Sequence, residues 1–198
     1  MSNKPQILAF SGSLQKKSKN RMLLDTAIKG AKNAGASVIV IDLQEFPLPI
    51  YNEDYEKENG LPENVKALKK LMKDSDGLLI ASPEYNSSIS GALKNMIDWV
   101  SRRESSDEPM LDSFNGKVAA IMSASPGGLG GIRGLIHLRS ILSCINVLVL
   151  PQQYALSSAH TAFDESGSMI DEKQALVVAE LGKSLADILT KIYHDNEK

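Results

Sequence analysis

Residues 77–100 read GLLIASPEYNSSISGALKNMIDWV, and the fold of the chain follows from this stretch. Its first five residues, Gly77 to Ala81, form an apolar run that is typical of a strand buried on both faces. A polar loop follows, and from about Ser90 to Ser101 apolar residues recur at helical spacing: Leu93, Met96, Ile97 and Val100. A buried strand that leads through a short loop into an amphipathic helix predicts one repeating unit of a parallel α/β sheet.

The same unit recurs on both sides of this stretch. Apolar or β-branched runs predict four further strands, at residues 7–10, 38–41, 118–122 and 147–150. Helical spacing predicts four further helices, around residues 23–31, from Pro62 onward, at about 132–144 and at about 171–193. Two segments are predicted to lack regular structure: the proline-containing residues 43–60, and a charged surface loop at 102–109.

Alternating helices and apolar strands predict an α/β fold in which helices cover both faces of a parallel sheet. Five strands favour a flavodoxin-like three-layer sandwich with strand order 2-1-3-4-5 over a six-stranded dinucleotide-binding fold. With 198 residues, 42% of them hydrophobic, we expect one domain spanning residues 1–198. Ligands of such sheets bind beyond the carboxyl ends of the strands, which makes the loops at 11–20, 82–90 and 123–131 the candidate site.

The bulk composition argues against several classes of function. A net charge of −2 and a pI near 5.9 offer no basic surface to a nucleic acid. The single cysteine, Cys144, forms neither an intramolecular disulfide nor an iron–sulfur cluster, and we expect it to be a buried structural thiol. His137, His160 and His194 show no metal-binding spacing, so no metal is expected. The apolar run near residue 7 is too short for a signal peptide or a membrane span, which predicts a cytoplasmic protein without membrane insertion.

The loop after the first predicted strand has the composition of a phosphate site. Three hydroxyls and an amide directly precede or begin a helix: Ser11, Ser13, Ser18 and Asn20. The N-terminus of a helix presents free N–H groups and the positive end of the helix dipole, which suit a phosphate. Three lysines add positive charge: Lys16, Lys17 and Lys19. The alternative is that Ser18 or Asn20 only caps the helix.

The loop after the third predicted strand has groups that can border a flat ring with a polar edge. Pro83 stiffens the exit of the strand, Tyr85 offers a flat aromatic surface, and Asn86 offers both a donor and an acceptor. Each of these residues is equally compatible with an ordinary turn between a strand and a capped helix.

Taken together, the run from Pro83 to Trp99 matches P-E-Y-N-x-S-x-x-G-x-L-K-N-x-x-D-W without a gap, and it thereby resembles the NADPH-dependent FMN reductase family. That family includes bacterial quinone, chromate and azo-dye reductases. It also has S-G-S-L-R-x-x-S-x-N at the first loop, where residues 11–20 read SGSLQKKSKN. The resemblance extends to residues 123–128, SASPGG, and covers about residues 7–150.

The resemblance implies noncovalently bound FMN, which NADPH or NADH reduces and a small acceptor reoxidises in a ping-pong cycle. Quinones suit two-electron transfer best, and azo dyes, nitroaromatics and chromate are further candidates. A homodimer or homotetramer is implied as well. No side chain is expected to act as a general acid or base, so no catalytic residue is assigned. Carried over by position, the cofactor-binding residues are Ser11, Ser13, Gln15, Ser18, Asn20, Pro83, Glu84, Tyr85, Asn86, Ser123, Ser125, Gly127 and Gly128.

Gln15 departs from the family pattern, which has an arginine at this position. If that arginine contacts the phosphate, its absence removes a charge-assisted hydrogen bond worth roughly 1.5–3 kcal/mol. Lys16 or Lys17 is the expected substitute, although an ammonium lacks the fork geometry of a guanidinium.

Two other functions fit the same topology. An FMN-binding electron carrier or redox-responsive module would serve a protein partner, but such carriers steer their partners with a strongly acidic surface, which a net charge of −2 does not supply. A flavin-free signalling domain needs acids after strand 1 and an aspartate after strand 3, where this chain has Ser11-Gly12-Ser13 and Ser82-Pro83.

Several residues outside the three loops are expected to be structural. Trp99 is predicted to lie in the core or at a subunit interface, and Tyr51 and Tyr55 are predicted to be exposed near an active site shared between subunits. The run from Arg102 to Glu104 is predicted to be a solvated face, with an arginine near such a shared site as the alternative.

Overall fold

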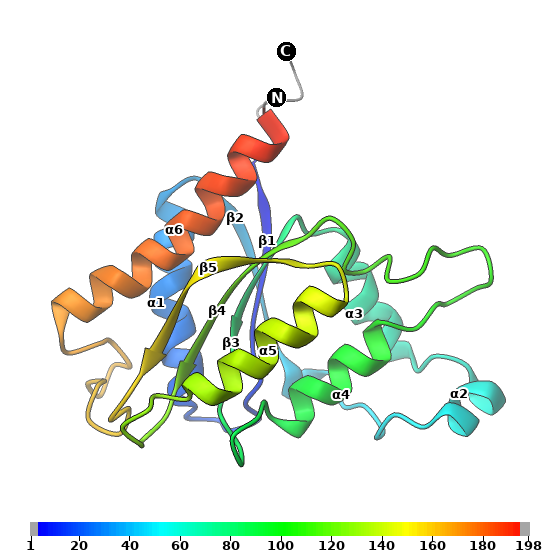
Figure 1. The fold of residues 1–198 in the computed structure, drawn as a ribbon, viewed down its shortest axis with the longest axis horizontal. Helices are drawn as coiled ribbons and strands as arrows, with labels where there is room; N and C mark the ends of the chain where they lie inside the picture. Colours follow the sequence, from blue (N-terminus) through cyan, green and yellow to red (C-terminus); the bar gives the residue numbers. More distant parts are fainter. Residues whose placement is uncertain (1–3, 195–198) are drawn as a thin grey trace.

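The computed structural model describes residues 4–194, and a five-stranded sheet lies at its centre (Figure 1). The strands lie in the order β2-β1-β3-β4-β5, and all neighbouring pairs are parallel. The predicted strand order is therefore confirmed. The bounds are β1 (Gln6–Ser11), β2 (Ser37–Asp42), β3 (Gly77–Ala81), β4 (Val118–Ala124) and β5 (Leu148–Leu156).

Helices cover both faces of the sheet, as predicted (Figure 1). One face carries α1 (Lys19–Asn33) and α6 (Glu172–His194), and the other carries α3 (Glu63–Lys73), α4 (Gly91–Val100) and α5 (Ile132–Cys144). Side chains of a strand point alternately to its two faces. Accordingly, Ile7 and Ala9 join the core under α1 and α6, whereas Leu8 and Phe10 join the core under the other three helices.

The helices α1 and α6 cross in close contact because each has a glycine at the crossing. A Cβ on Gly30 would lie 1.8 Å from the carbonyl oxygen of Ala179, and a Cβ on Gly182 would lie 1.9 Å from that of Ala27. Two backbones approach this closely only where a side chain is missing. Among residues 4–194, neither this pair nor any other helix is long and apolar enough to cross a membrane.

The prediction that residues 43–60 are irregular is wrong. A 3-10 turn spans Leu43–Glu45, and α2 spans Glu53–Asn59. Asn52 caps α2, since its side chain accepts hydrogen bonds from the N–H groups two and three residues further on, at 2.8 and 3.1 Å. Three acids in the first turn and Gly60 at the end complete the signals of a short helix. Hydrophobic periodicity missed this helix because α2 has no buried residue.

Strand β5 ends at Leu156, well past the predicted end at residue 150. Pro151 lies within it, at the point where the pairing with β4 shifts register. A proline, which has no N–H to donate, is tolerated at a bulge in an edge strand. The ends of β1 and β4 also extend beyond their predicted bounds, so that Ser11 and Ser123 belong to strands rather than to loops.

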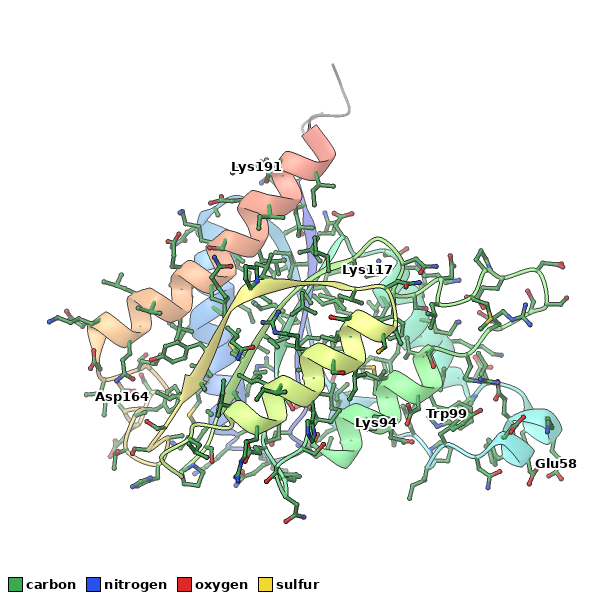
Figure 2. All side chains as sticks on the ribbon, in the orientation of Figure 1. Glu58, Lys94, Trp99, Lys117, Asp164 and Lys191 are labelled. Carbon is green, nitrogen blue, oxygen red and sulfur yellow. The ribbon has the colours of Figure 1, made fainter. Side chains whose placement is uncertain are left out.

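Trp99 is fully buried, which confirms its predicted place in the core, and it lies against the segment that precedes α2 (Figure 2). Its Nε1 donates a hydrogen bond to the carbonyl oxygen of Pro49 at 2.8 Å. The ring of Tyr51 meets the indole edge-on, with 5.0 Å between the ring centroids. Tyr51 is therefore half-buried rather than exposed, whereas Tyr55 is exposed as predicted.

One further side-chain prediction is wrong. Cys144 is exposed, because it lies off the buried stripe of α5, which consists of Gly134, Leu135, Leu138 and Leu142. The run from Arg102 to Glu104 is largely solvated, as predicted: Arg103 and Glu104 are exposed, and the Arg102 side chain is 42% exposed. Its Nε also donates to both carboxylate oxygens of Glu56, at 3.0 and 2.9 Å. This ion pair joins the end of α4 to α2.

Candidate functional site

The three predicted loops meet in one pocket beyond the carboxyl ends of the strands. The pocket has a volume of about 280 Å³. Parallel sheets bind ligands at this edge, beside the point where the strand order reverses. The residues that line the pocket are Ser13, Gln15, Ser18, Lys19, Asn20, Pro83, Glu84, Tyr85, Ala124, Ser125, Pro126, Ala159 and His160.

The segment between β1 and α1 folds into a chain of short polar contacts. The hydroxyl of Ser11 accepts a hydrogen bond from the N–H of Ser13 at 3.2 Å, and the hydroxyl of Ser13 accepts one from the N–H of Gln15 at 3.2 Å. Ser18 caps α1 by accepting from the N–H of Arg21 at 3.3 Å. Ser13 and Ser18 line the pocket, whereas Ser11 is buried behind it and supports the loop.

Asn20 lines the pocket, but its side chain is already engaged. Its Nδ2 donates to the carbonyl oxygen of Ala124 at 2.9 Å, and its Oδ1 accepts from the N–H of the same residue at 2.9 Å. The amide thus ties the first turn of α1 to the end of β4, in the way that a neighbouring strand would pair. Of the two residues that were considered as caps, Ser18 caps α1, and Asn20 instead connects α1 to Ala124 at the end of β4.

Gly12 and Ser90 hold the first loop against the second. A Cβ on Gly12 would lie 3.0 Å from the Cβ of Leu93, so the loop lies almost directly on α4. The Ser90 hydroxyl donates to the carbonyl oxygen of Gly12 and accepts from the N–H of Leu93 at 3.2 Å, which caps α4. The glycine is therefore required by the close approach of the two loops.

The segment between β3 and α4 makes a tight two-residue turn. Tyr85 and Ser88 exchange backbone hydrogen bonds of 2.9 and 3.0 Å around Asn86 and Ser87, whose φ angles are 51° and 65°. Asparagine tolerates such left-handed backbone better than most residues. Tyr85 is 55% exposed and lies on the pocket wall, while Asn86 is exposed at the tip of the turn, outside the lining.

Glu84 borders the pocket, and its carboxylate is bound by α5. Arg133 donates to Oε1 through Nε at 2.9 Å and through a second guanidinium nitrogen, and the N–H of Gly134 donates to Oε2 at 3.0 Å. Burial by itself raises the pKa of this carboxyl, but the Gly134 N–H and the Arg133 guanidinium outweigh burial and lower the pKa below its usual value. Glu84 is therefore an ionised anchor for the N-terminus of α5.

The segment between β4 and α5 is shaped by close backbone approach. Ser123 is fully buried at the end of β4, and its hydroxyl has no hydrogen-bond partner among the described residues. A Cβ on Gly131 would lie 1.9 Å from that hydroxyl oxygen, and Gly131 also has a φ of 91°. Ser125 lines the pocket and accepts from the N–H of Gly127 at 3.3 Å, whereas Gly127 and Gly128 are exposed outside the lining.

A fourth segment, after β5, completes the pocket, and no function was predicted for it from the sequence. Ala159 and His160 belong to this segment and line the pocket. The carboxyl end of β5 opens at the same edge as that of β4, but the predicted strand stopped at residue 150, which hid this neighbourhood. Lys19, Ala124 and Pro126 also line the pocket; they belong to the predicted loops but were not among the predicted cofactor-binding residues.

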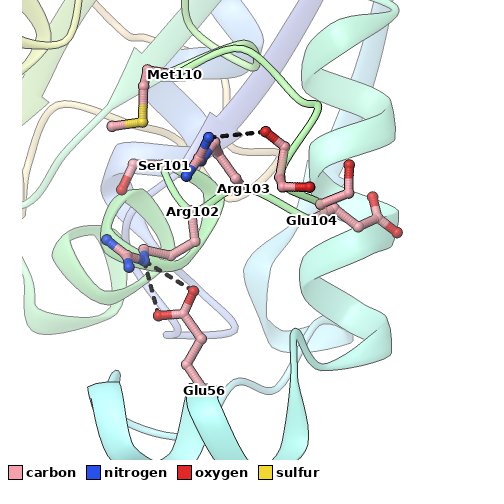
Figure 3. Close-up of a pocket in the computed structure, with 8 residues that line it drawn as sticks. Glu56, Ser101, Arg102, Arg103, Glu104 and Met110 are labelled. Atoms are coloured by element: carbon pink, nitrogen blue, oxygen red, sulfur yellow. Dashed lines mark hydrogen bonds and ion pairs between the residues drawn. The ribbon is translucent and has the colours of Figure 1, made fainter.

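A larger cavity, of about 490 Å³, lies elsewhere on the molecule (Figure 3). It follows the C-terminus of α4 and is bordered by Glu56, Arg102 and Met110. Because α4 begins at the strand ends, its C-terminus leads away from them, and this cavity receives no residue from β1, β3 or β4. Size alone therefore does not identify the site. Within the described part of the chain, which excludes the His194 side chain, no three His, Cys, Asp or Glu residues gather as metal ligands.

Residues 5–161 match the family model described as NADPH-dependent FMN reductase. The chain belongs to the NADPH-dependent FMN reductase family. Curated relatives agree with this assignment. The chain is 40% identical to an NAD(P)H-dependent FMN reductase of Pseudomonas aeruginosa, with 87% of this chain and 89% of the relative covered. It is 36% identical to a quinone reductase of Escherichia coli, with coverage of 87% and 88%.

Solved structures have a similar fold. The flavoenzyme NAD(P)H:(acceptor) oxidoreductase of Paracoccus denitrificans superposes with a TM-score of 0.78 at 30% identity, covering 94% of this chain and 98% of that chain. A flavodoxin from the domain Archaea superposes with a TM-score of 0.60 at 10% identity, covering 93% and 98%. The second likeness concerns the fold alone, and it confirms that this FMN reductase family member has a flavodoxin-like fold.

Proposed function

We propose that the protein is an NAD(P)H-dependent FMN reductase that uses quinones as electron acceptors. The observation that carries this proposal is the single pocket in which three family-type segments converge at the strand ends. When FMN is bound, it supplies the chemistry: it accepts a hydride from NAD(P)H and passes two electrons to the acceptor. The protein supplies position and electrostatics.

The donors in the pocket fit a flavin mononucleotide. The hydroxyls of Ser13 and Ser18 lie beside the first turn of α1, where the N–H groups of Lys19 and Asn20 have no acceptor within the helix. A phosphate monoester matches such a set of hydroxyls and free N–H groups. Lys19 lines the same pocket and contributes positive charge.

The remaining lining suits the rest of the cofactor. Pro83 and Tyr85 provide a flat, partly apolar wall for the ring. Ser125 lines another part of the pocket, and Gly127 and Gly128, which follow it outside the lining, carry no side chain that would obstruct the ring. Eight of the thirteen predicted positions line the pocket, and the other five, Ser11, Asn86, Ser123, Gly127 and Gly128, lie in the adjoining segments outside the lining. Ser11, Asn20 and Glu84 are proposed to act through the loops that they hold.

The finer parts of the proposal concern acceptors, assembly and location. Quinones are the acceptor class of the Escherichia coli relative, and azo dyes, nitroaromatics and chromate are proposed as secondary acceptors. A homodimer or homotetramer in the cytoplasm is proposed from the resemblance to the family. Sedimentation equilibrium of the FMN-loaded protein would measure the assembly directly, and a monomer would contradict it.

The absorbance spectrum of the purified protein, taken before and after anaerobic addition of NADPH or NADH, tests the function. We expect a flavin band that bleaches with the reduced nicotinamide and returns when a quinone is added. A flavin band that neither nucleotide bleaches would instead favour an electron carrier for a protein partner. A protein that takes up no FMN at all would contradict both functions.

A further inference from the structure

We propose that Lys19 and His160 together hold the phosphate of FMN, in place of the arginine that the family motif has at position 15. The proposal rests on the proposed function, because it concerns the same pocket. Gln15 lines this pocket but is neutral, so the site lacks the guanidinium at that position. A dianionic phosphate then needs its charge balanced by other side chains.

The two lysines first expected to replace the arginine do not reach the pocket. Lys16 and Lys17 are exposed and lie outside its lining, although they neighbour Gln15 in the sequence. Lys19 lies on the first residue of α1 and does line the pocket. The lysine that can contact a ligand in the pocket is therefore Lys19 on the helix rather than a lysine of the loop, and it lies next to the free N–H groups of the first turn.

Contacts on two sides hold the Lys19 side chain in place. Its Nζ lies 3.7 Å from the Sδ of Met22 and 5.4 Å from the centroid of the Phe163 ring. Phe163 is 93% buried in the segment after β5, since its exposed fraction is 7%, and this segment also carries His160. Lys19 has no ion-pair partner among the described residues, so its charge is available to a ligand.

The segment that carries His160 is fixed to the end of β4. The N–H of Ala159 donates to the carbonyl oxygen of Ser125 at 3.1 Å, and the N–H of Ser125 donates to that of Leu156 at 3.0 Å. Ala159 is 1% exposed, whereas His160 is exposed and lines the pocket. This anchored segment thus places an imidazole, which can donate a hydrogen bond, on the lining of the pocket that Lys19 also lines.

The charge of the pocket favours an anion. Its one acidic lining residue, Glu84, is paired with Arg133 and the N–H of Gly134. The Lys19 ammonium is the one lining charge that has no ion-pair partner among the described residues. Ser13, Ser18 and the helix N-terminus provide neutral donors beside it. The arrangement matches the terminal phosphate that distinguishes FMN from riboflavin.

Calorimetric titration of the apoprotein with FMN and with riboflavin isolates the phosphate. We expect Lys19→Gln and His160→Ala each to weaken FMN binding about tenfold, with riboflavin binding unchanged, as the loss of one charge-assisted hydrogen bond implies. Lys17→Gln is the matched control, because it removes the same charge two positions earlier in the chain, from an exposed lysine outside the pocket lining. Gln15→Arg, added to Lys19→Gln, is expected to restore the preference for FMN. Circular dichroism checks that each variant is folded.

The possible results distinguish a failure of the proposed role of Lys19 and His160 from a failure of the proposed FMN reductase function. Wild-type protein that binds neither flavin would overturn the proposed function. Wild-type protein that prefers FMN, with both variants keeping the same ratio of FMN to riboflavin affinity, would overturn the role of Lys19 and His160 alone. Equal losses for both flavins, or a loss in Lys17→Gln as large as that in Lys19→Gln, would also overturn it.

Discussion

The Asn20 amide makes two hydrogen bonds to the backbone of Ala124, across a sequence separation of 104 residues. Both residues are almost fully buried, so removing the amide leaves the N–H and the carbonyl oxygen of Ala124 without their protein partner. The first turn of α1, which bears the phosphate-binding groups of the proposed site, depends on this crosslink for its position.

Asn20→Ala is therefore expected to destabilise the protein by roughly 2–4 kcal/mol, which corresponds to a melting temperature lower by about 5–10 °C. Thermal unfolding followed by circular dichroism measures this. Asn64→Ala is the control, because Asn64 makes a single exposed hydrogen bond to Pro47 and should change the melting temperature little. If both substitutions lower the melting temperature equally, the hydrogen bonds between Asn20 and Ala124 contribute no more to stability than an exposed hydrogen bond does.

Glu84 illustrates what a residue pattern leaves open. Its position in the P-E-Y-N run predicts a place at the cofactor site, and the pocket lining includes it. Its carboxylate, however, binds Arg133 and the N–H of Gly134, some 50 positions further along the chain. Sequence order contains no information about which distant helix will offer donors. The position of a motif residue was predictable, but the partner of its side chain was not.

At the scale of elements, the crossing of α1 and α6 depends on two glycines. Gly182→Ala is expected to destabilise the protein by about 3 kcal/mol or more, because the new Cβ meets the backbone of Ala27 and overpacking outweighs the gain in helix propensity. Gly91→Ala is the control: it is also helical, but a Cβ there meets nothing within 4 Å. Urea unfolding measures both, and a mild effect of Gly182→Ala would mean that α6 can shift.

A buried ion-pair cluster fixes the 102–113 segment to α3. The Oε1 of Glu108 forms ion pairs with the Nζ of Lys69 at 2.9 Å and with the Nζ of Lys73 at 2.6 Å. The other carboxylate oxygen accepts a hydrogen bond from the N–H of Glu104. Burial raises the pKa of Glu108, but the Glu104 N–H and the two ammonium groups more than offset this and lower the pKa to about 2. The pKa of Glu108 is therefore lower in the folded protein than the value of 4.5 in the unfolded chain. The ionised carboxylate stabilises the fold at every pH above 4.5, and this stabilisation is lost as the pH falls from 4.5 toward 2.

Glu108→Gln is expected to lower the free energy of unfolding by roughly 2–3 kcal/mol at neutral pH. The difference from wild type should shrink as pH falls below 4.5, since protonation removes the same charge from wild type. Urea unfolding in steps from neutral to acidic pH tests this. Glu63→Gln, which breaks an exposed pair with Lys66, should show neither effect. A difference that stays constant with pH would contradict the role of ionised Glu108.

Hydrophobic pattern accounts for the elements that the sequence predicted correctly. The five strands and the helices α1, α3, α4, α5 and α6 all bury an apolar face, and periodicity records burial. The short helix α2 has no buried residue, and the later half of β5 lies at the edge of the sheet with exposed polar residues. Neither segment therefore has a periodic pattern of apolar residues from which it could be predicted. The missed part of β5 is also what concealed His160 from the predicted site.

At the scale of the whole molecule, the proposed site joins four segments that are distant in sequence, and a ligand bound there couples them. If FMN binds only the folded protein, an FMN concentration one hundred times the dissociation constant raises the free energy of unfolding by about 2.7 kcal/mol. We therefore expect the melting temperature to rise by about 5–10 °C with saturating FMN.

Hydrogen–deuterium exchange with and without FMN locates that stabilisation. We expect slower exchange in residues 11–20, 82–90 and 123–131, and also in the segment from Ser158 to Thr161, because its backbone is tied to Ser125 at the pocket. The segment around Arg102 and Met110 is the internal control, since it borders the larger cavity away from the strand ends. Protection confined to that segment would place FMN in the wrong cavity for the proposed mechanism. Protection of the first three segments without the fourth would leave the pocket in place but remove His160 from it.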